Sequence, residues 1–142
     1  IRFGASYDDV IGADLVDDYN AWATRFPDAD LGDPDGDHDA DGLTNDQERL
    51  FGLDPTNGSS LDPFAVPLVP GDNTLSYTRR DITLSGLSYS VWTSTDLIDW
   101  DEDTAAVQTP GSPDANDIQT VAVTIGAAPA GGRLYVRIQA GE

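Results

Sequence analysis

Aspartates on alternate residues are the part of this sequence best suited to chemistry. Every odd position from Asp33 to Asp41 is Asp, and the acidic stretch continues through Gly42 and Asn45 to Glu48. Short carboxylate side chains at this spacing can curl round one ion, whereas without an ion their mutual repulsion would hold the loop open. Ca²⁺ is a hard cation that takes about six to eight oxygen ligands. The stretch therefore predicts a calcium site rather than a solvated acidic loop.

A known loop template assigns the ligands. Read from Asp37, the stretch matches the EF-hand pattern D-x-[DN]-x-[DN]-G-x5-E at every specified position, with Gly42 at the sharp turn. In such loops most ligands are side-chain oxygens and one is a backbone carbonyl, and the closing Glu is bidentate. Asn45 would act directly or through water, and Leu43 through its carbonyl. The predicted ligands are Asp37, Asp39, Asp41, Leu43, Asn45 and Glu48.

A second, overlapping register starts four residues earlier. It has His38 where glycine is preferred and Thr44 where an acid should stand, so it is incomplete. Asp28 and Asp30 lie just upstream and could complete it. The sequence therefore leaves open whether one or two ions bind. The ligands of the second ion would be Asp33, Asp35, Asp37, the Asp39 carbonyl and Asp41.

Composition excludes several classes of function. The 142 residues include 26 acids and 7 bases, all of them Arg, for a formal net charge of -19. Nucleic acids and anionic membrane surfaces repel such a chain, and no apolar run is long enough to span a bilayer. We therefore expect no nucleic-acid partner and no membrane insertion.

The absence of Cys points to another means of stabilisation. No disulfide framework can hold this fold, but calcium bound only to the native state would stabilise it by mass action. Extracellular modules bind calcium weakly, which suits the calcium level outside cells. The chain starts at Ile1 rather than Met, as a processed product or an excised piece of a longer chain would. We therefore expect a secreted or cell-surface location.

Two short helices are predicted to flank the acidic loop. The first is capped by Asp14 and ends at Pro27. The second opens with a capping box formed by Thr44 and Gln47 and stops at Gly52. Residues 1–58 are thus predicted to form a helical calcium-binding unit. The core face of the first helix would comprise Leu15, Tyr19, Trp22 and Phe26.

The second half of the chain has the pattern of strands. Residues 59–73 are rich in Pro and are interpreted as a linker or edge segment. Residues 74–142 show short alternating runs that predict an antiparallel β-sandwich of about five to seven strands, so the fold class is α+β. The alternating positions are Leu75 and Tyr77; Ile82 and Leu84; Leu87, Tyr89 and Val91; Val121, Val123 and Ile125; and Leu134, Val136 and Ile138.

No catalytic constellation accompanies these elements. The single histidine, His38, lies inside the acidic loop, and neither a reactive Cys nor a phosphate-binding motif is present. Trp92 and Trp100 could stack on sugar rings, although the more ordinary roles are that Trp92 packs under a strand and that Trp100 closes the turn 96–100. The sequence therefore predicts a protein that is not an enzyme.

Two resemblances support this interpretation. The loop from Asp37 to Glu48, followed by Phe51-Gly52-Leu53-Asp54-Pro55-Thr56, resembles the bacterial thrombospondin type 3-like calcium repeat of secreted and surface proteins. The resemblance implies that Asp37, Asp39, Asp41, Asn45 and Glu48 bind calcium and that Asp54 is structural. The chain has one complete copy and half of another, so a long calcium rod is not implied. Residues 77–80, 89–100 and 133–138 resemble the small C-terminal β-domain of many secreted bacterial proteins, which implies an accessory or surface module.

The expected function is that of a secreted, calcium-stabilised structural or cell-surface module without catalytic activity. One alternative is a subunit of an extracellular fibre assembled by strand addition, in which Ile1–Ser6 would join an edge of the sandwich at residues 75–139. Another is a carbohydrate-binding accessory domain using Trp92, Trp100 or Tyr135. The expected partners are calcium ions, further copies of the chain or domains of its parent protein, and polysaccharide.

Overall fold

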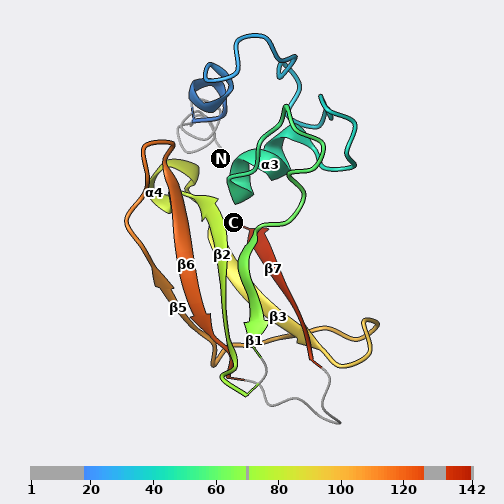
Figure 1. Cartoon of the computed structure of the whole chain (residues 1–142), viewed down its shortest axis with the longest axis vertical. Helices are drawn as coiled ribbons and strands as arrows, with labels where there is room; N and C mark the ends of the chain where they lie inside the picture. Colours follow the sequence, from blue (N-terminus) through green and yellow to red (C-terminus); the bar gives the residue numbers. More distant parts are fainter. Residues whose placement is uncertain (1–17, 70, 127–133, 142) are drawn as a thin grey trace, which may run out of the picture. The chain divides into compact units, whose positions relative to one another are not determined.

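The computed structural model describes residues 18–69, 71–126 and 134–141 (Figure 1). It divides the chain into two compact units. The first comprises residues 1–62 and 80–86, and the second comprises residues 63–79 and 87–142. The predicted division into 1–58, 59–73 and 74–142 used contiguous stretches, whereas segment 80–86 returns to the first unit. Within the described residues, no helix combines the length and the apolar character needed to cross a bilayer.

An aromatic cluster forms the core of the first unit. Residues 18–23 are helical, and Tyr19, Trp22 and Leu31 are buried with Phe26 packed against them. The Trp22 ring centroid lies 5.5 Å from that of Tyr19 and 5.4 Å from that of Phe26. The Tyr19 hydroxyl donates to the Leu31 carbonyl at 2.8 Å. Core packing of Tyr19 and Trp22 is thus confirmed; Asp14 and Leu15 lie outside the described residues.

Helix α3 (Asn45–Phe51) begins and ends where its caps predict. The Thr44 hydroxyl accepts from the Gln47 N–H at 3.1 Å, and the Gln47 side chain accepts from the Thr44 N–H at 2.8 Å. Gly52 closes the helix in the left-handed conformation at φ 67°, which glycine adopts without steric cost. Because these caps fix where α3 begins, residues 33–44 of the acidic stretch precede the helix and residues 45–48 form its first turn.

A network of buried ion pairs connects α3 to other segments of the first unit. The Asp18 carboxylate, on the first described turn, accepts from the Arg49 guanidinium and from Arg80 Nη2, the latter at 2.7 Å. All three residues are buried. Arg49 also binds Asp46 at 2.8 Å. Buried charges are tolerated when they are paired in this way, so the network joins α3, the 18–23 helix and segment 80–86 within one unit.

Two antiparallel sheets make up the second unit (Figure 1). The first has the strand order β1 (Phe64–Val69), β2 (Thr74–Arg80), β6 (Ile118–Thr124) and β5 (Val107–Pro110). The second has the order β4 (Asp101–Glu102), β3 (Ser88–Ser94) and β7 (Tyr135–Gly141). β3 pairs with β7 along its whole length, from Ser88 opposite Gly141 to Ser94 opposite Tyr135. The β-rich, sandwich-like character of this half is thus confirmed, and β1 is an edge strand within residues 59–73.

Alternate residues of the strands supply the core of the second unit. Across the two sheets, the ring centroids of Tyr77 and Tyr89 are 6.2 Å apart. The Tyr77 hydroxyl donates to Gln108 Oε1 at 2.6 Å, and Gln108 Nε2 donates to the Tyr89 carbonyl at 2.8 Å. The inner faces of the sheets are therefore joined by ring contact and hydrogen bonds. The buried apolar residues are Leu75, Tyr77, Tyr89, Val91, Val121, Val123 and Ile125.

One predicted strand is wrong. Ile82 and Leu84 alternate as strand residues do, but they lie in a single helical turn, α4 (Ile82–Ser85). Asp81 caps this turn by accepting from the Thr83 N–H at 3.0 Å, and Gly86 ends it at φ 72°. Two apolar residues carry little periodic information, and local capping decided the conformation instead. The short strands β4 and β5 were not predicted.

Candidate metal centre

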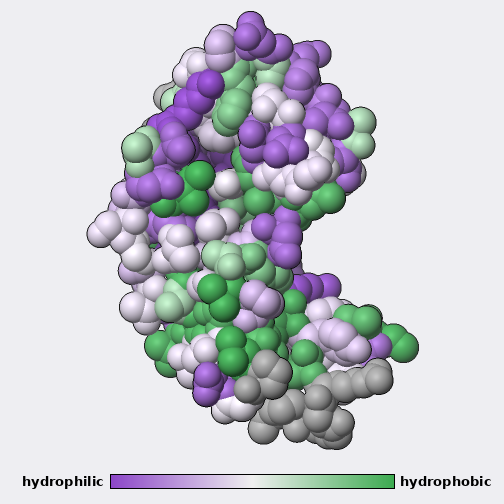
Figure 2. Space-filling view, viewed as in Figure 1, coloured by the Kyte–Doolittle hydropathy of each residue, from purple (hydrophilic) through white to green (hydrophobic). Residues whose placement is uncertain are grey.

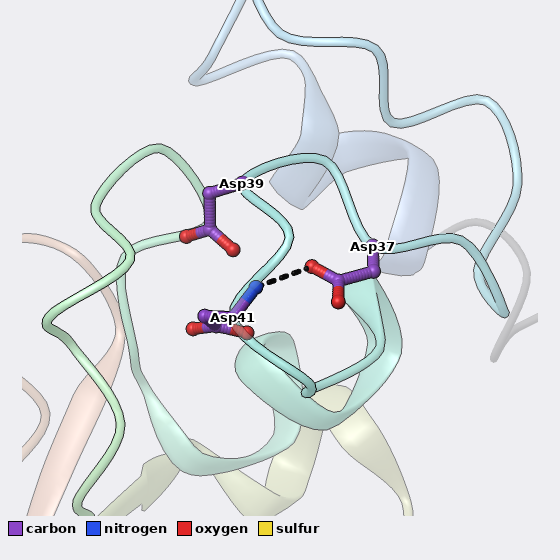
Figure 3. A group of neighbouring side chains, drawn as sticks. All are labelled: Asp37, Asp39 and Asp41. Carbon is purple, nitrogen blue, oxygen red and sulfur yellow. Dashed lines mark hydrogen bonds between the residues drawn. The ribbon is translucent and has the colours of Figure 1, made fainter.

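Three aspartates of the acidic loop converge on one point. One carboxylate oxygen from each of Asp37, Asp39 and Asp41 lies within 4.8 Å of the others, and Figure 3 shows their side chains turned toward a common space. The chain bends sharply at Gly42, whose φ of 99° suits glycine alone. The alternation seen in the sequence thus becomes a ring of oxygens. Within the described ranges, this is the only group of three or more metal-binding side chains this close together.

Asp37 shapes the loop. Its Oδ1 accepts from the Asp41 N–H at 3.1 Å and its Oδ2 from the Gly42 N–H at 2.9 Å. These backbone donors, Gly42 first, stabilise the ionised form and lower the pKa of Asp37. Asp41 Oδ1 in turn accepts from the Leu43 N–H at 2.8 Å. The loop is therefore folded by its own carboxylates.

Asn45 braces the loop from the first residue of α3. Its side chain is buried; Oδ1 accepts from the His38 N–H at 3.1 Å, and Nδ2 donates to the Asp33 carbonyl at 2.9 Å. The Asn45 N–H also donates to the Gly36 carbonyl at 2.7 Å. The amide thus holds the start of the loop to the helix, and its direct or water-mediated contact with an ion stays a prediction.

Glu48 approaches the loop from α3. The side chain is 0% exposed. Burial first, and then the charges of Asp39, Asp41 and Asp37, together raise the pKa of Glu48 to about 8. Glu48 is not one of the three closest carboxylates, but the charges of all three aspartates act on its carboxyl group. A helix residue and a loop therefore enclose one acidic site.

Buried carboxylate oxygens without hydrogen-bond partners show whether a cation fits this space. Both oxygens of Asp39, one of Asp41 and both of Glu48 are buried without any hydrogen-bond partner. Burial, followed by the charges of Asp41 and Asp37, raises the pKa of Asp39. A buried carboxylate without a partner is costly because its charge is no longer solvated. A hard cation bound among these oxygens would supply the missing partner, so the residues fit such an ion.

Asp33 and Asp35, the further side-chain ligands of the second predicted ion, do not belong to the compact group. Asp33 and Asp35 are exposed, and Asp33 Oδ1 accepts from the Asp35 N–H at 3.0 Å. His38 is also exposed, and its Nδ1 accepts from the Asp30 N–H at 3.2 Å. None of these residues joins the compact group, so the second ion stays a prediction. The same holds for the Leu43 carbonyl as a ligand.

A turn after α3 forms a wall of the site that sequence reasoning missed. A Cβ atom at Gly58 would lie 3.6 Å from the Asp39 carbonyl oxygen and 3.8 Å from the Asp41 Cβ. The charge of Asp54 adds to the rise in the pKa of Glu48. Pro55 is fully buried. The element Gly-x-Asp-Pro could have predicted this wall, because it places a rigid turn directly after the end of the helix.

Comparisons of the chain with protein-family models, with curated proteins and with solved structures found no match. The geometry of the acidic loop and of α3 is therefore the basis on which a function can be assigned.

Proposed function

We propose that the chain is a secreted or cell-surface structural module that binds calcium between Asp37, Asp39, Asp41 and Glu48. The observation that carries the proposal is the set of buried carboxylate oxygens without partners on Asp39, Asp41 and Glu48. In this proposal the ion completes a helix–calcium loop–helix unit made of the 18–23 helix, the acidic loop and α3. The module has a structural role and performs no catalysis.

The donor set favours calcium among biological cations. All four side chains are carboxylates, and the chain has no Cys to attract a softer metal. Mg²⁺ prefers a small octahedral shell that keeps several waters, whereas Ca²⁺ accepts a crowded and irregular set of carboxylates. The single histidine is turned to Asp30. An all-carboxylate site of this kind fits Ca²⁺ best.

Calcium would act by neutralising charge and by tying α3 to the loop. The ion supplies the positive charge that four clustered carboxylates lack. Asp37 already organises the loop through its two backbone hydrogen bonds, and Asn45 holds the loop to the helix. Because these hydrogen bonds already order the loop without an ion, calcium binding should carry only a small cost in conformational entropy. Glu48 would then connect the ion to the helix that carries Arg49 and its buried network.

Isothermal titration calorimetry of the full chain with CaCl₂ tests the proposal. We expect one binding event in the wild-type protein, and a large loss of affinity in Glu48→Gln. The matched control is Glu102→Gln, the same change at an exposed residue of β4, which should bind as the wild type does. An absence of heat in the wild type, or equal affinity in both variants, would show that the proposed site does not bind calcium.

The carbohydrate alternative has less support. The Arg137 guanidinium lies over both candidate rings, 5.7 Å from the Trp92 centroid and 4.6 Å from the Trp100 centroid. One face of each ring is therefore occupied rather than offered to a sugar. Among the described residues, the most exposed large apolar side chain is that of Ile98, at 80%. Ile98 is aliphatic and lies in the loop after β3, and the end of this loop is coloured hydrophobic in Figure 2.

The fibre alternative stays a prediction as well. Its donor segment, Ile1–Ser6, lies outside the described residues. Pro67 and two register irregularities interrupt the ladder of the edge strand β1, which are features that discourage edge-to-edge pairing. No observation favours strand addition over the calcium module.

A further inference from the structure

We propose that Asn57 is a site of spontaneous deamidation, and that the modified residue alters the wall of the metal loop. The reaction itself does not depend on a bound metal. Its effect on calcium affinity rests on the function proposed above. Asn57 and Gly58 are both exposed and lie in the turn that follows α3. Asn57 is the only one of the five asparagines that precedes a glycine.

The turn holds the Asn57 side chain against the main chain. Asn57 Oδ1 accepts from the Ser59 N–H at 3.0 Å, which folds the side chain back over the main chain. The Asn57 carbonyl accepts from the Ser60 N–H at 2.8 Å. Among the residues that the structure describes, the Gly58 N–H has no hydrogen-bond partner. The Gly58 nitrogen, the nucleophile of the reaction, is therefore not held in a hydrogen bond by any described residue, and glycine presents no Cβ to hinder its approach to the side-chain amide.

The chemistry needs only water. The Gly58 nitrogen loses its proton to solvent and attacks Asn57 Cγ; the N–Cγ bond forms and the side-chain nitrogen leaves as ammonia. The product is a cyclic succinimide. Water then adds to one of its two carbonyl carbons and opens the ring, giving aspartate or isoaspartate at position 57. No oxidant, reductant or enzyme takes part, and isoaspartate lengthens the main chain by one carbon.

Other asparagines provide an internal comparison. Asn45 is 1% exposed, and its amide is held by two hydrogen bonds. Each of the remaining three precedes a residue with a side chain, which hinders attack on the amide carbon. They are Asn20, Asn73 and Asn116. Modification should therefore be confined to Asn57.

The position of Gly58 connects the modification to the metal loop. A Cβ there would touch the Asp39 carbonyl oxygen at 3.6 Å, so the turn packs directly on the loop. An extra main-chain carbon at residue 57 would shift this contact, because close-packed surfaces do not absorb added atoms without displacement. We expect the isoaspartate form to bind calcium several-fold more weakly than the unmodified protein.

The test follows the full chain by mass spectrometry during incubation with a chelator at mildly alkaline pH. Wild-type protein should release ammonia and gain the mass difference between NH₂ and OH at residue 57. Gly58→Ala is the matched control, since a Cβ there meets only ordinary contacts and the fold is kept; it should react several-fold more slowly. The assignment of Asn57 as the deamidation site would be refuted by modification at another asparagine, by no modification, or by equal rates in both proteins.

A second arm tests the consequence. Modified and fresh protein are titrated with CaCl₂ by calorimetry, together with Asn57→Asp, which adds the charge without lengthening the chain. Weaker binding only in the isoaspartate form supports displacement of the loop, and equal binding in all three refutes any effect on the metal site. If fresh protein does not bind calcium, the function proposed above fails while the mass result for Asn57 still decides the modification.

Discussion

Replacing Glu48 with Gln should change the stability of the protein in opposite directions with and without calcium. The Glu48 side chain is 0% exposed, and neither of its oxygens has a partner. In the metal-free protein its ionised form must sit among the charges of Asp39, Asp41 and Asp37. Gln has nearly the same shape and no charge, so it removes this repulsion. It also removes one of the four carboxylates proposed to bind calcium.

The pH dependence gives the sign and the size of the effect without calcium. Burial, followed by the aspartate charges, raises the folded-state pKa of Glu48 from 4.5 to about 8. A raised pKa contributes stability that is fully present below pH 4.5 and is lost as the pH rises through 8. One proton per molecule corresponds to a slope of at most about 1.4 kcal/mol per pH unit. Wild-type protein in chelator should therefore lose stability from pH 5 to pH 9, and Glu48→Gln should lack this loss.

With calcium the order reverses. At a free calcium concentration about a hundred times the dissociation constant, binding stabilises the native state by about 2.7 kcal/mol. Glu48→Gln should lose most of this gain because the ion no longer finds its buried ligand. In calcium at pH 8 the wild type should thus be the more stable protein, whereas in chelator at pH 9 the variant should be.

Urea unfolding followed by circular dichroism measures both effects. The free energy of unfolding is compared at pH 5 and pH 9, in chelator and in calcium, with Glu102→Gln as the exposed control. Each unit is fitted separately if two transitions appear. The reasoning is refuted if Glu48→Gln keeps the wild-type loss of stability between pH 5 and pH 9 in chelator, or if calcium stabilises both proteins equally.

Three further substitutions have expected outcomes. Asp18→Asn removes the buried carboxylate that Arg49 and Arg80 share, although Arg49 keeps its pair with Asp46, and should lower the free energy of unfolding by about 3–5 kcal/mol in urea; a change near zero would contradict the network. Gly126→Ala places a Cβ 2.5 Å from that of Ala105, and should cost about 1–3 kcal/mol, unlike the tolerated Gly58→Ala; equal melting temperatures would be evidence against the clash. Arg137→Ala uncovers two indole rings and should increase quenching of tryptophan fluorescence by acrylamide; unchanged quenching would mean that the rings are shielded by other groups.

Features fixed by neighbouring residues could be predicted from the sequence. Helix α3 follows from the reciprocal bonds of Thr44 and Gln47 and from the stop at Gly52, all within eight residues of one another. The convergence of Asp37, Asp39 and Asp41 follows from their spacing and from the turn at Gly42. Such signals act over one or two turns of chain, and they hold whatever the rest of the fold does.

Features that join distant residues, and one short turn whose local pattern was ambiguous, could not be predicted. Asp18 meets Arg80 across 62 positions of sequence, and nothing local marks either residue as buried. The Asn45 amide braces the loop through residues 33 and 38, which was not predicted, whereas its contact with an ion stays a prediction. Ile82 and Leu84 alternated like strand residues, but the cap at Asp81 and the stop at Gly86 made a helical turn. Tertiary contacts decided the first two features. Local caps overrode a weak periodic pattern at Ile82 and Leu84.

A crystal structure grown in calcium, with anomalous differences recorded at long wavelength, tests the central claim most directly. We expect one calcium peak in the acidic loop, about 2.3–2.6 Å from oxygens of Asp37, Asp39, Asp41 and Glu48. The buried oxygens of Asp39 and Glu48, which have no partner in the protein, should be among its ligands. A loop without a peak in saturating calcium, or an ion bound away from these four carboxylates, would contradict the account.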